Sequence, residues 1–151
     1  MIRTRLSAAV TSEPPANEPA PTTVATGNPF ADRVTVIGAR ALLMREIPVQ
    51  SPSSINAMFE RIDTLSQDWD RFSYVVDLTE AKRPDAATRA TLKERVRRIT
   101  PRVDHVAIVV GHNLLMRAMA RLVAHGMGLV SVSVHTTRAE AIEEIGSGMG
   151  R

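Results

Sequence analysis

The segment from Tyr74 to Ile99, YVVDLTEAKRPDAATRATLKERVRRI, constrains the fold more than any other part of the chain. An apolar run, Tyr74–Val76, ends in Asp77, and after a short polar bend Pro84-Asp85 opens an amphipathic stretch. This pattern predicts a buried strand that delivers the chain to the N-terminus of a helix, where the first backbone N–H groups attract negative charge. The bend would lie at the carboxyl end of the strand, and in α/β sheets ligands and partners bind at that edge of the sheet. The bend has no serine and no glycine-rich loop, so we interpret it as a recognition surface rather than an active centre.

Apolar runs alternate with amphipathic stretches over the rest of the chain. We expect strands at Val34–Ile37, Ala41–Met44, Tyr74–Leu78, Val106–Val110 and Val130–Val134, and helices after Pro52, from about Asp85 to Ile99, over Leu115–Val123 and over Arg138–Ile145. The order β-β-α-β-α-β-α-β-α predicts an α/β fold with a small mixed, mostly parallel sheet, an N-terminal β-hairpin and about four helices. The β-branched run at Val106–Val110 is typical of a strand buried on both faces.

The two ends of the chain differ in composition from this pattern. Residues 1–30 are rich in Pro, Ala and Thr and are expected to form a disordered tail, residues 31–145 one domain, and residues 146–151 a flexible C-terminal tail. No run approaches the roughly 20 apolar residues of a membrane span. The absence of cysteine excludes disulfides and thiolate sites and is consistent with a reducing, cytoplasmic compartment.

Basic residues concentrate on one segment. The formal net charge is only +3, yet Lys82 to Arg102 contains eight basic residues against Asp85 and Glu94. Such a run is either a solvated helix face or a surface that suits an acidic partner. Because no aromatic residues are interleaved with the charges, specific nucleic-acid binding is not expected.

Common catalytic and cofactor motifs are missing. The histidines at 105, 112, 125 and 135 show no metal-ligand spacing, and no phosphate-binding glycine loop is present, so we expect no metal and no cofactor. Asp77 lacks the acidic and lysine partners of a phospho-accepting aspartate. We interpret it as a structural residue that accepts backbone hydrogen bonds at the turn.

The order of elements and several local phrases resemble the STAS family, which includes bacterial anti-sigma factor antagonists. Asp77-Leu78-Thr79 is similar to the end of the family's third strand, and Asp85-Ala86-Ala87-Thr88 occupies the place of its Asp-Ser-Ser/Thr-Gly element. The resemblance covers about residues 31–145 and implies a non-catalytic regulatory domain that binds a protein partner. That partner is expected to be a kinase-like anti-sigma factor or another acidic-surfaced regulator.

This sequence departs from the family at the phosphorylated position. Alanines stand at 86 and 87, so the serine switch is expected to be absent, and Thr79 or Thr88 are the remaining hydroxyls. Asp85 is expected to cap the helix that begins there. The expected partner-binding residues lie in the bend, at the helix start and in the turn after the fourth strand: Thr79, Arg83, Asp85, Ala86, Ala87, Thr88, Arg89, His112 and Asn113.

Two alternative functions remain open from the sequence. One is a small-molecule or lipid carrier with an apolar pocket lined by Met58, Met116 and Met119. The other is an enzyme that uses His112 or His135 with Asp77.

Overall fold

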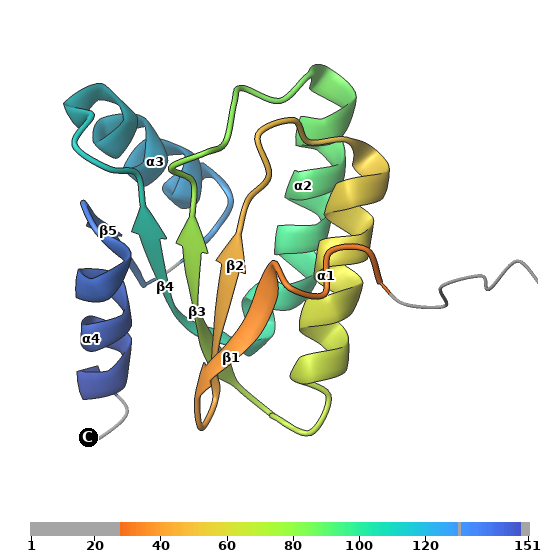
Figure 1. Cartoon of the computed structure of the whole chain (residues 1–151), viewed down its shortest axis with the longest axis vertical. Coiled ribbons are helices and arrows are strands. Elements are labelled where there is room, and N and C mark those ends of the chain that lie inside the picture. Colours follow the sequence, from red (N-terminus) through yellow and green to blue (C-terminus); the bar gives the residue numbers. More distant parts are fainter. Residues whose placement is uncertain (1–27, 130, 149–151) are drawn as a thin grey trace, which may run out of the picture.

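The computed structural model describes residues 28–129 and 131–148. Strands and helices follow one another in the expected order, which confirms the α/β fold (Figure 1). The elements are β1 (Val34–Gly38), β2 (Ala41–Arg45), α1 (Pro52–Leu65), β3 (Phe72–Asp77), α2 (Ala86–Ile99), β4 (Val103–Val109), α3 (Leu114–Gly126), β5 (Val132–His135) and α4 (Arg138–Gly148), with a 3-10 turn at Thr100–Arg102.

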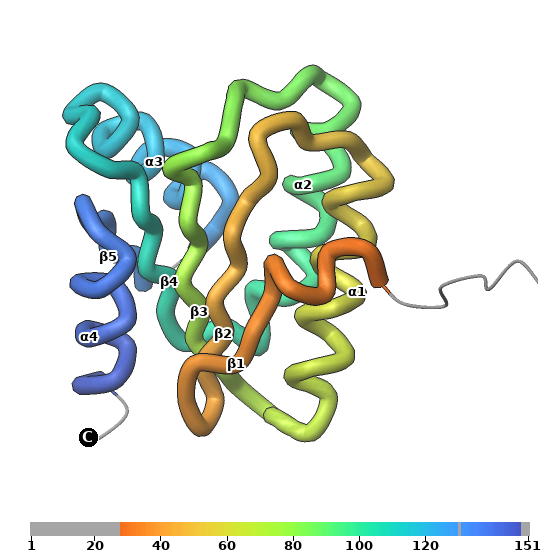
Figure 2. Tube along the Cα trace, viewed as in Figure 1, coloured from red at the N-terminus to blue at the C-terminus, as the bar shows by residue number. Residues whose placement is uncertain are grey.

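The five strands form one sheet whose spatial order, β1-β2-β3-β4-β5, is the order of the sequence. The β1–β2 hairpin is antiparallel, and β2 to β5 are parallel. In the register across the parallel strands, Leu42 lies opposite Tyr74, Tyr74 opposite Val106, and Val106 opposite Val132. The carboxyl ends of β2, β3 and β4 therefore meet at one edge, and the tube trace shows the chain segments that follow β2 and β3 running together there (Figure 2).

Side chains alternate between two cores, one on each face of the sheet. The larger core receives Tyr74 and Val106 from the central strands and apolar residues from α1, α2 and the inner side of α3. The smaller core lies under α4, where Val75 and Ala107 pack against Ala141 and Ile145 of that helix. Burial on both faces explains why β3 and β4 read as nearly continuous apolar runs.

Local signals at the start of α1 explain its position. Ser51 caps the helix, and Ser54 completes a reciprocal capping box, while Pro52 occupies the first turn, where its missing N–H costs no hydrogen bond. Apolar residues then recur at spacings of three and four, and those facing the sheet are fully buried: Ile55, Met58, Phe59 and Ile62.

The observed boundaries differ from the expected ones by one to three residues at several places; β4, for example, begins at Val103 and not at Val106. β5 begins at Val132, and Val130, expected to start it, lies outside the described residues. α4 continues to Gly148, beyond the expected end at Ile145. Of the expected N-terminal tail, residues 1–27 also lie outside the described part, whereas Asn28 donates a side-chain hydrogen bond to the carbonyl of Ala57 at 2.6 Å. Phe30 packs against the larger core.

α3 differs most from what its apolar pattern indicates. The pattern does place Leu115, Met119 and Leu122 on one side, but this side faces outward, and small residues at Ala120 and Ala124 make the inward contacts. Among the helices that the structure describes, none combines the length and apolarity required to cross a bilayer.

Candidate functional site

The site is built on the end of β3, the central strand of the sheet. Asp77 is the last residue of β3, and its Oδ1 accepts hydrogen bonds from the backbone N–H of Thr79 at 3.0 Å and from the Thr79 hydroxyl at 2.6 Å. This confirms the expected structural role of Asp77 at the turn. The two bonds fix the direction in which residues 79–89, hereafter the 79–89 segment, leave the sheet.

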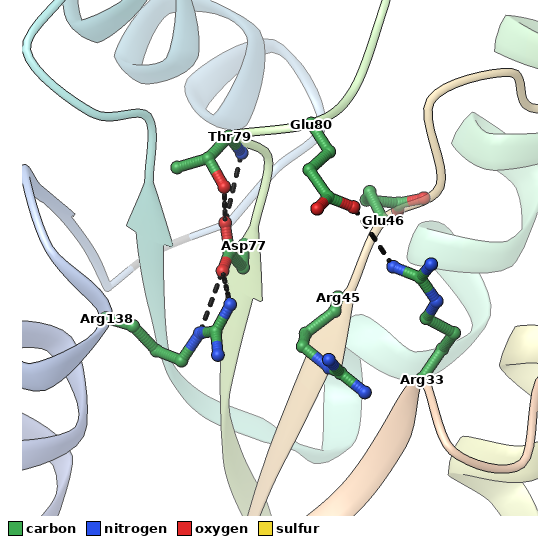
Figure 3. Close-up of a pocket in the computed structure, with 7 residues that line it drawn as sticks. All are labelled: Arg33, Arg45, Glu46, Asp77, Thr79, Glu80 and Arg138. Carbon is green, nitrogen blue, oxygen red and sulfur yellow. Dashed lines mark hydrogen bonds and ion pairs between the residues drawn. The ribbon is translucent and has the colours of Figure 1, made fainter.

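The sequence did not indicate the second partner of Asp77. Arg138, at the start of α4, donates from Nε at 2.9 Å and from Nη2 at 2.6 Å to the other carboxylate oxygen (Figure 3). Asp77 is only 4% exposed, and this burial disfavours its charged form. The Thr79 donors and the Arg138 guanidinium outweigh burial, so the pKa of Asp77 lies below its ordinary value. The pair ties the helix on one face to the strand that delivers the 79–89 segment.

A small polar pocket of about 20 Å³ opens beside this pair, the size of a single water. Its lining includes an ion pair between Arg33 and Glu80, which are 3.2 Å apart, and the side chain of Arg45. Glu46, just after β2, also lines it (Figure 3). Burial raises the pKa of Glu46 to about 7, against the opposing effect of a hydrogen bond from the Gln50 amide.

A wider groove of about 290 Å³ lies between the segment after β2 and the 79–89 segment. The backbone N–H of Lys82 donates to the carbonyl of Pro48 at 3.2 Å and holds the two segments together. The groove is lined by residues of both: Pro48, Val49, Gln50, Lys82, Arg83, Pro84 and Asp85. Two of the expected partner-binding residues, Arg83 and Asp85, therefore line one recess, and both side chains are exposed.

The start of α2 has the expected cap. The Asp85 carboxylate accepts from the backbone N–H of Thr88 at 2.7 Å, and this N–H is the main cause of a lowered pKa of Asp85. Ala86 and Ala87 are exposed on the first turn, but Thr88 is fully buried. Arg89 donates to the carbonyl of Pro84 at 2.8 Å, which folds its guanidinium back over the bend.

The turn after β4 lies next to the bend. Gly111 has φ +69°, a left-handed conformation, and a Cβ built on it would lie 4.0 Å from the Thr79 side chain. Asn113 caps α3 by accepting from the N–H groups of Leu115 and Met116 at 3.0 and 3.2 Å. The predicted residues of this turn thus lie at the same edge as Thr79. Asn113 acts as a helix cap, and His112 is exposed.

The structure shows a polar network that sequence reasoning missed, on the face of the sheet covered by α4. Ser133 of β5 contacts His105, His135 and Glu144: His105 Nε2 and His135 Nε2 each lie 2.9 Å from its hydroxyl, which also donates to the Glu144 carboxylate. Glu144 lies 2.5 Å from His135 Nε2. Burial opposes ionisation of Glu144, but the Ser133 hydroxyl and the His135 imidazole lower its pKa. The alternation Ser131-Val132-Ser133-Val134-His135 was the available signal, because period two places these polar residues on one face.

These contacts bear on the two alternative functions, an enzyme and a small-molecule or lipid carrier. Asp77 is paired with Arg138, and His135 with Glu144 and Ser133, so each residue of the enzyme hypothesis other than exposed His112 already has a partner elsewhere. The described residues contain no group of three or more His, Cys, Asp or Glu side chains placed to hold a metal ion. Met58 is fully buried, whereas Met116 and Met119 are partly exposed on α3, and none of the three lines the pocket or the groove described above.

Comparison with known proteins gives no family: no protein-family model and no curated protein matches this chain.

Proposed function

We propose that this chain is a non-catalytic, STAS-like interaction domain of the bacterial cytoplasm that binds a protein regulator with an acidic surface, such as a kinase-like anti-sigma factor. The observation that carries the proposal is the exposed 79–89 segment at the carboxyl ends of the parallel strands. It is fixed by Asp77 at its start and by the Asp85 cap near its end. A recognition surface needs this kind of rigid backbone, because ordering a loose loop on binding would cost free energy.

The charge of the surface supports an acidic partner. Lys82, Arg83 and Arg89 are exposed around the groove, and Asp85, the acidic residue among them, is held by its capping bond. Cations at the rim of an interface chiefly raise the association rate and select the partner by charge. Pro48 and Val49 add exposed apolar surface to the groove lining, which a partner side chain could contact.

The exposed alanines indicate how binding would be regulated. Ala86 and Ala87 present methyl groups where the family's antagonists carry a phosphorylated hydroxyl, and buried Thr88 is not accessible to a kinase. Binding through this surface would therefore be independent of phosphorylation at residues 86–88. Regulation would then act through exposed Thr79, through the amount of the protein or through its partner.

The test is a pull-down from the native host with Arg83→Glu/Arg89→Glu, compared with Lys93→Glu/Arg97→Glu. Both variants reverse two exposed cations, but only the first alters the 79–89 segment. We expect the first variant to lose the partner that the wild type captures and the second to retain it. Equal capture by all three proteins would exclude this surface.

A further inference from the structure

The outward side of α3 is an apolar surface, which we define as Leu114, Leu115, Met116, Met119, Leu122 and Val123. Leu115 is 69% exposed and Leu122 is 74% exposed, and apart from Val36 and Val49 every exposed large hydrophobic residue in the described part of the chain lies here. Contiguous exposed apolar patches of this kind mark interaction sites on soluble domains. Figure 1 shows α3 at one end of the molecule, beside the carboxyl ends of the strands.

Polar residues of α3 lie on the opposite side of the same helix. Arg121 and His125 are exposed, and Arg117 turns inward, where its guanidinium lies 3.4 Å from both the Val134 carbonyl and the Thr136 hydroxyl. No carboxylate occurs between Leu114 and Gly126. The helix is thus strongly amphipathic, with an apolar side that faces away from the protein and cations on its polar side.

A second helix on the same face of the sheet adds to this positive charge. α2 precedes α3 along the chain and contributes to the same core, and it carries five basic residues against Glu94. Four of these cations are exposed: Arg89, Lys93, Arg97 and Arg98. α3 has an exposed apolar face and no acidic residue, and both α3 and α2 carry exposed cations. These properties fit an environment with an apolar interior and an anionic surface. That is the chemistry of a bilayer containing anionic phospholipids.

A second copy of the chain fits this face less well. α3 is about 20 Å long, so a pair of α3 helices alone would bury far less than the roughly 800 Å² per partner of a standard interface. A second α3 also offers no carboxylate to the cations of this region, whereas anionic headgroups do.

We propose that α3 docks on anionic lipid bilayers, with its apolar face in the interfacial region and its cations at the lipid headgroups. This surface is separate from the groove and is tested by different variants. A single basic residue near an anionic membrane strengthens binding by about fivefold, so the interaction is expected to weaken as salt is raised.

The test uses the full chain and co-sedimentation with vesicles of phosphatidylcholine alone or mixed with phosphatidylglycerol. We expect binding to the anionic vesicles, severalfold weaker binding without phosphatidylglycerol, and loss of binding in Leu115→Glu/Leu122→Glu. Val49→Glu is the matched control, because Val49 is 74% exposed outside α3, and it should bind like the wild type. Arg121→Glu should weaken binding more than tenfold, whereas Arg40→Glu, in the β1–β2 turn, should not.

A second measurement keeps the proposal testable if a glutamate variant misfolds. The chain has no cysteine, so Met119→Cys can carry a single environment-sensitive fluorophore, with Val49→Cys as its control. Anionic vesicles should shift the emission of the label at 119 to the blue and leave that at 49 unchanged. Absence of both vesicle binding and the shift would overturn the proposal. So would a stable dimer in light scattering that Leu115→Glu/Leu122→Glu converts to a monomer, because a second copy would then cover the face.

Discussion

The buried carboxyl of Glu46 should make this protein lose stability as the pH rises toward neutrality. Glu46 is 2% exposed, and burial raises its pKa from 4.5 to about 7 in the folded protein. Between these two values the folded state holds a proton that the unfolded chain has released. The free energy of unfolding therefore falls with rising pH, by up to about 1.4 kcal/mol per pH unit from this group.

Between pH 4.5 and about pH 7 the free energy of unfolding falls by about 3 kcal/mol because of Glu46. Above pH 7 this group causes no further loss. Glu46→Gln removes the titration but retains an amide oxygen that can accept the hydrogen bond from Gln50. We expect the variant to be more stable than the wild type by about 2–3 kcal/mol at pH 8. Near pH 4.5 the two proteins should differ little, because the wild-type carboxyl is then protonated when folded.

Urea unfolding followed by far-UV circular dichroism at several pH values between 4.5 and 8 measures this effect. The quantity of interest is the difference between variant and wild type, because the titrations of all other groups cancel in it. Glu143→Gln, at an exposed position of α4, is the control and should stay within about 0.5 kcal/mol of the wild type. A difference between Glu46→Gln and wild type that is constant from pH 4.5 to pH 8 would refute the reasoning.

Substitutions at three further sites, two of them with a control variant, test other parts of the structure by urea unfolding. Arg138→Met leaves the buried Asp77 carboxylate without its cation and should cost about 2–3 kcal/mol at pH 7. The lowered pKa of Asp77 means that this cost should shrink as the pH falls through that pKa; a pH-independent cost would contradict the ion pair. Asp85→Ala should cost about 1 kcal/mol through the lost cap and Asp85→Asn much less, so equal losses would argue against capping. Gly111→Ala should cost about 1–2 kcal/mol because φ is +69°, whereas Gly126→Ala, in a helix with open space around it, should be neutral or stabilising.

Sequence reasoning recovered the features that depend on local chemistry. Asp85 as a helix cap and Asp77 as the acceptor at the turn were both predicted from neighbouring residues. The two-faced burial of β4 followed from its β-branched run. These features were predictable because each requires only a few consecutive residues.

The features that were missed depend on which face each element covers. Arg138 reaches Asp77 from 61 residues away because α4 lies across the sheet from α1 and α2, and no local pattern specifies that crossing. The periodicity of α3 shows an apolar side but not its direction, which is decided by the close inward contacts of Ala124. Thr88 is buried because α2 is rotated about its axis so that this residue faces the core. The apolar stripe of α2 is short, so the sequence does not specify that rotation closely.

The agreement between spatial and sequential strand order bears on how the protein is made. Each parallel strand is laid down beside the one translated just before it, so a chain emerging from the ribosome can extend its sheet without waiting for distant segments. The bond from Arg138 to Asp77 is the exception, since it joins the last helix to the middle of the molecule. Until α4 has been made, one face of the nascent sheet lacks its apolar cover, and the Asp77 carboxylate at the end of β3 lacks its cation.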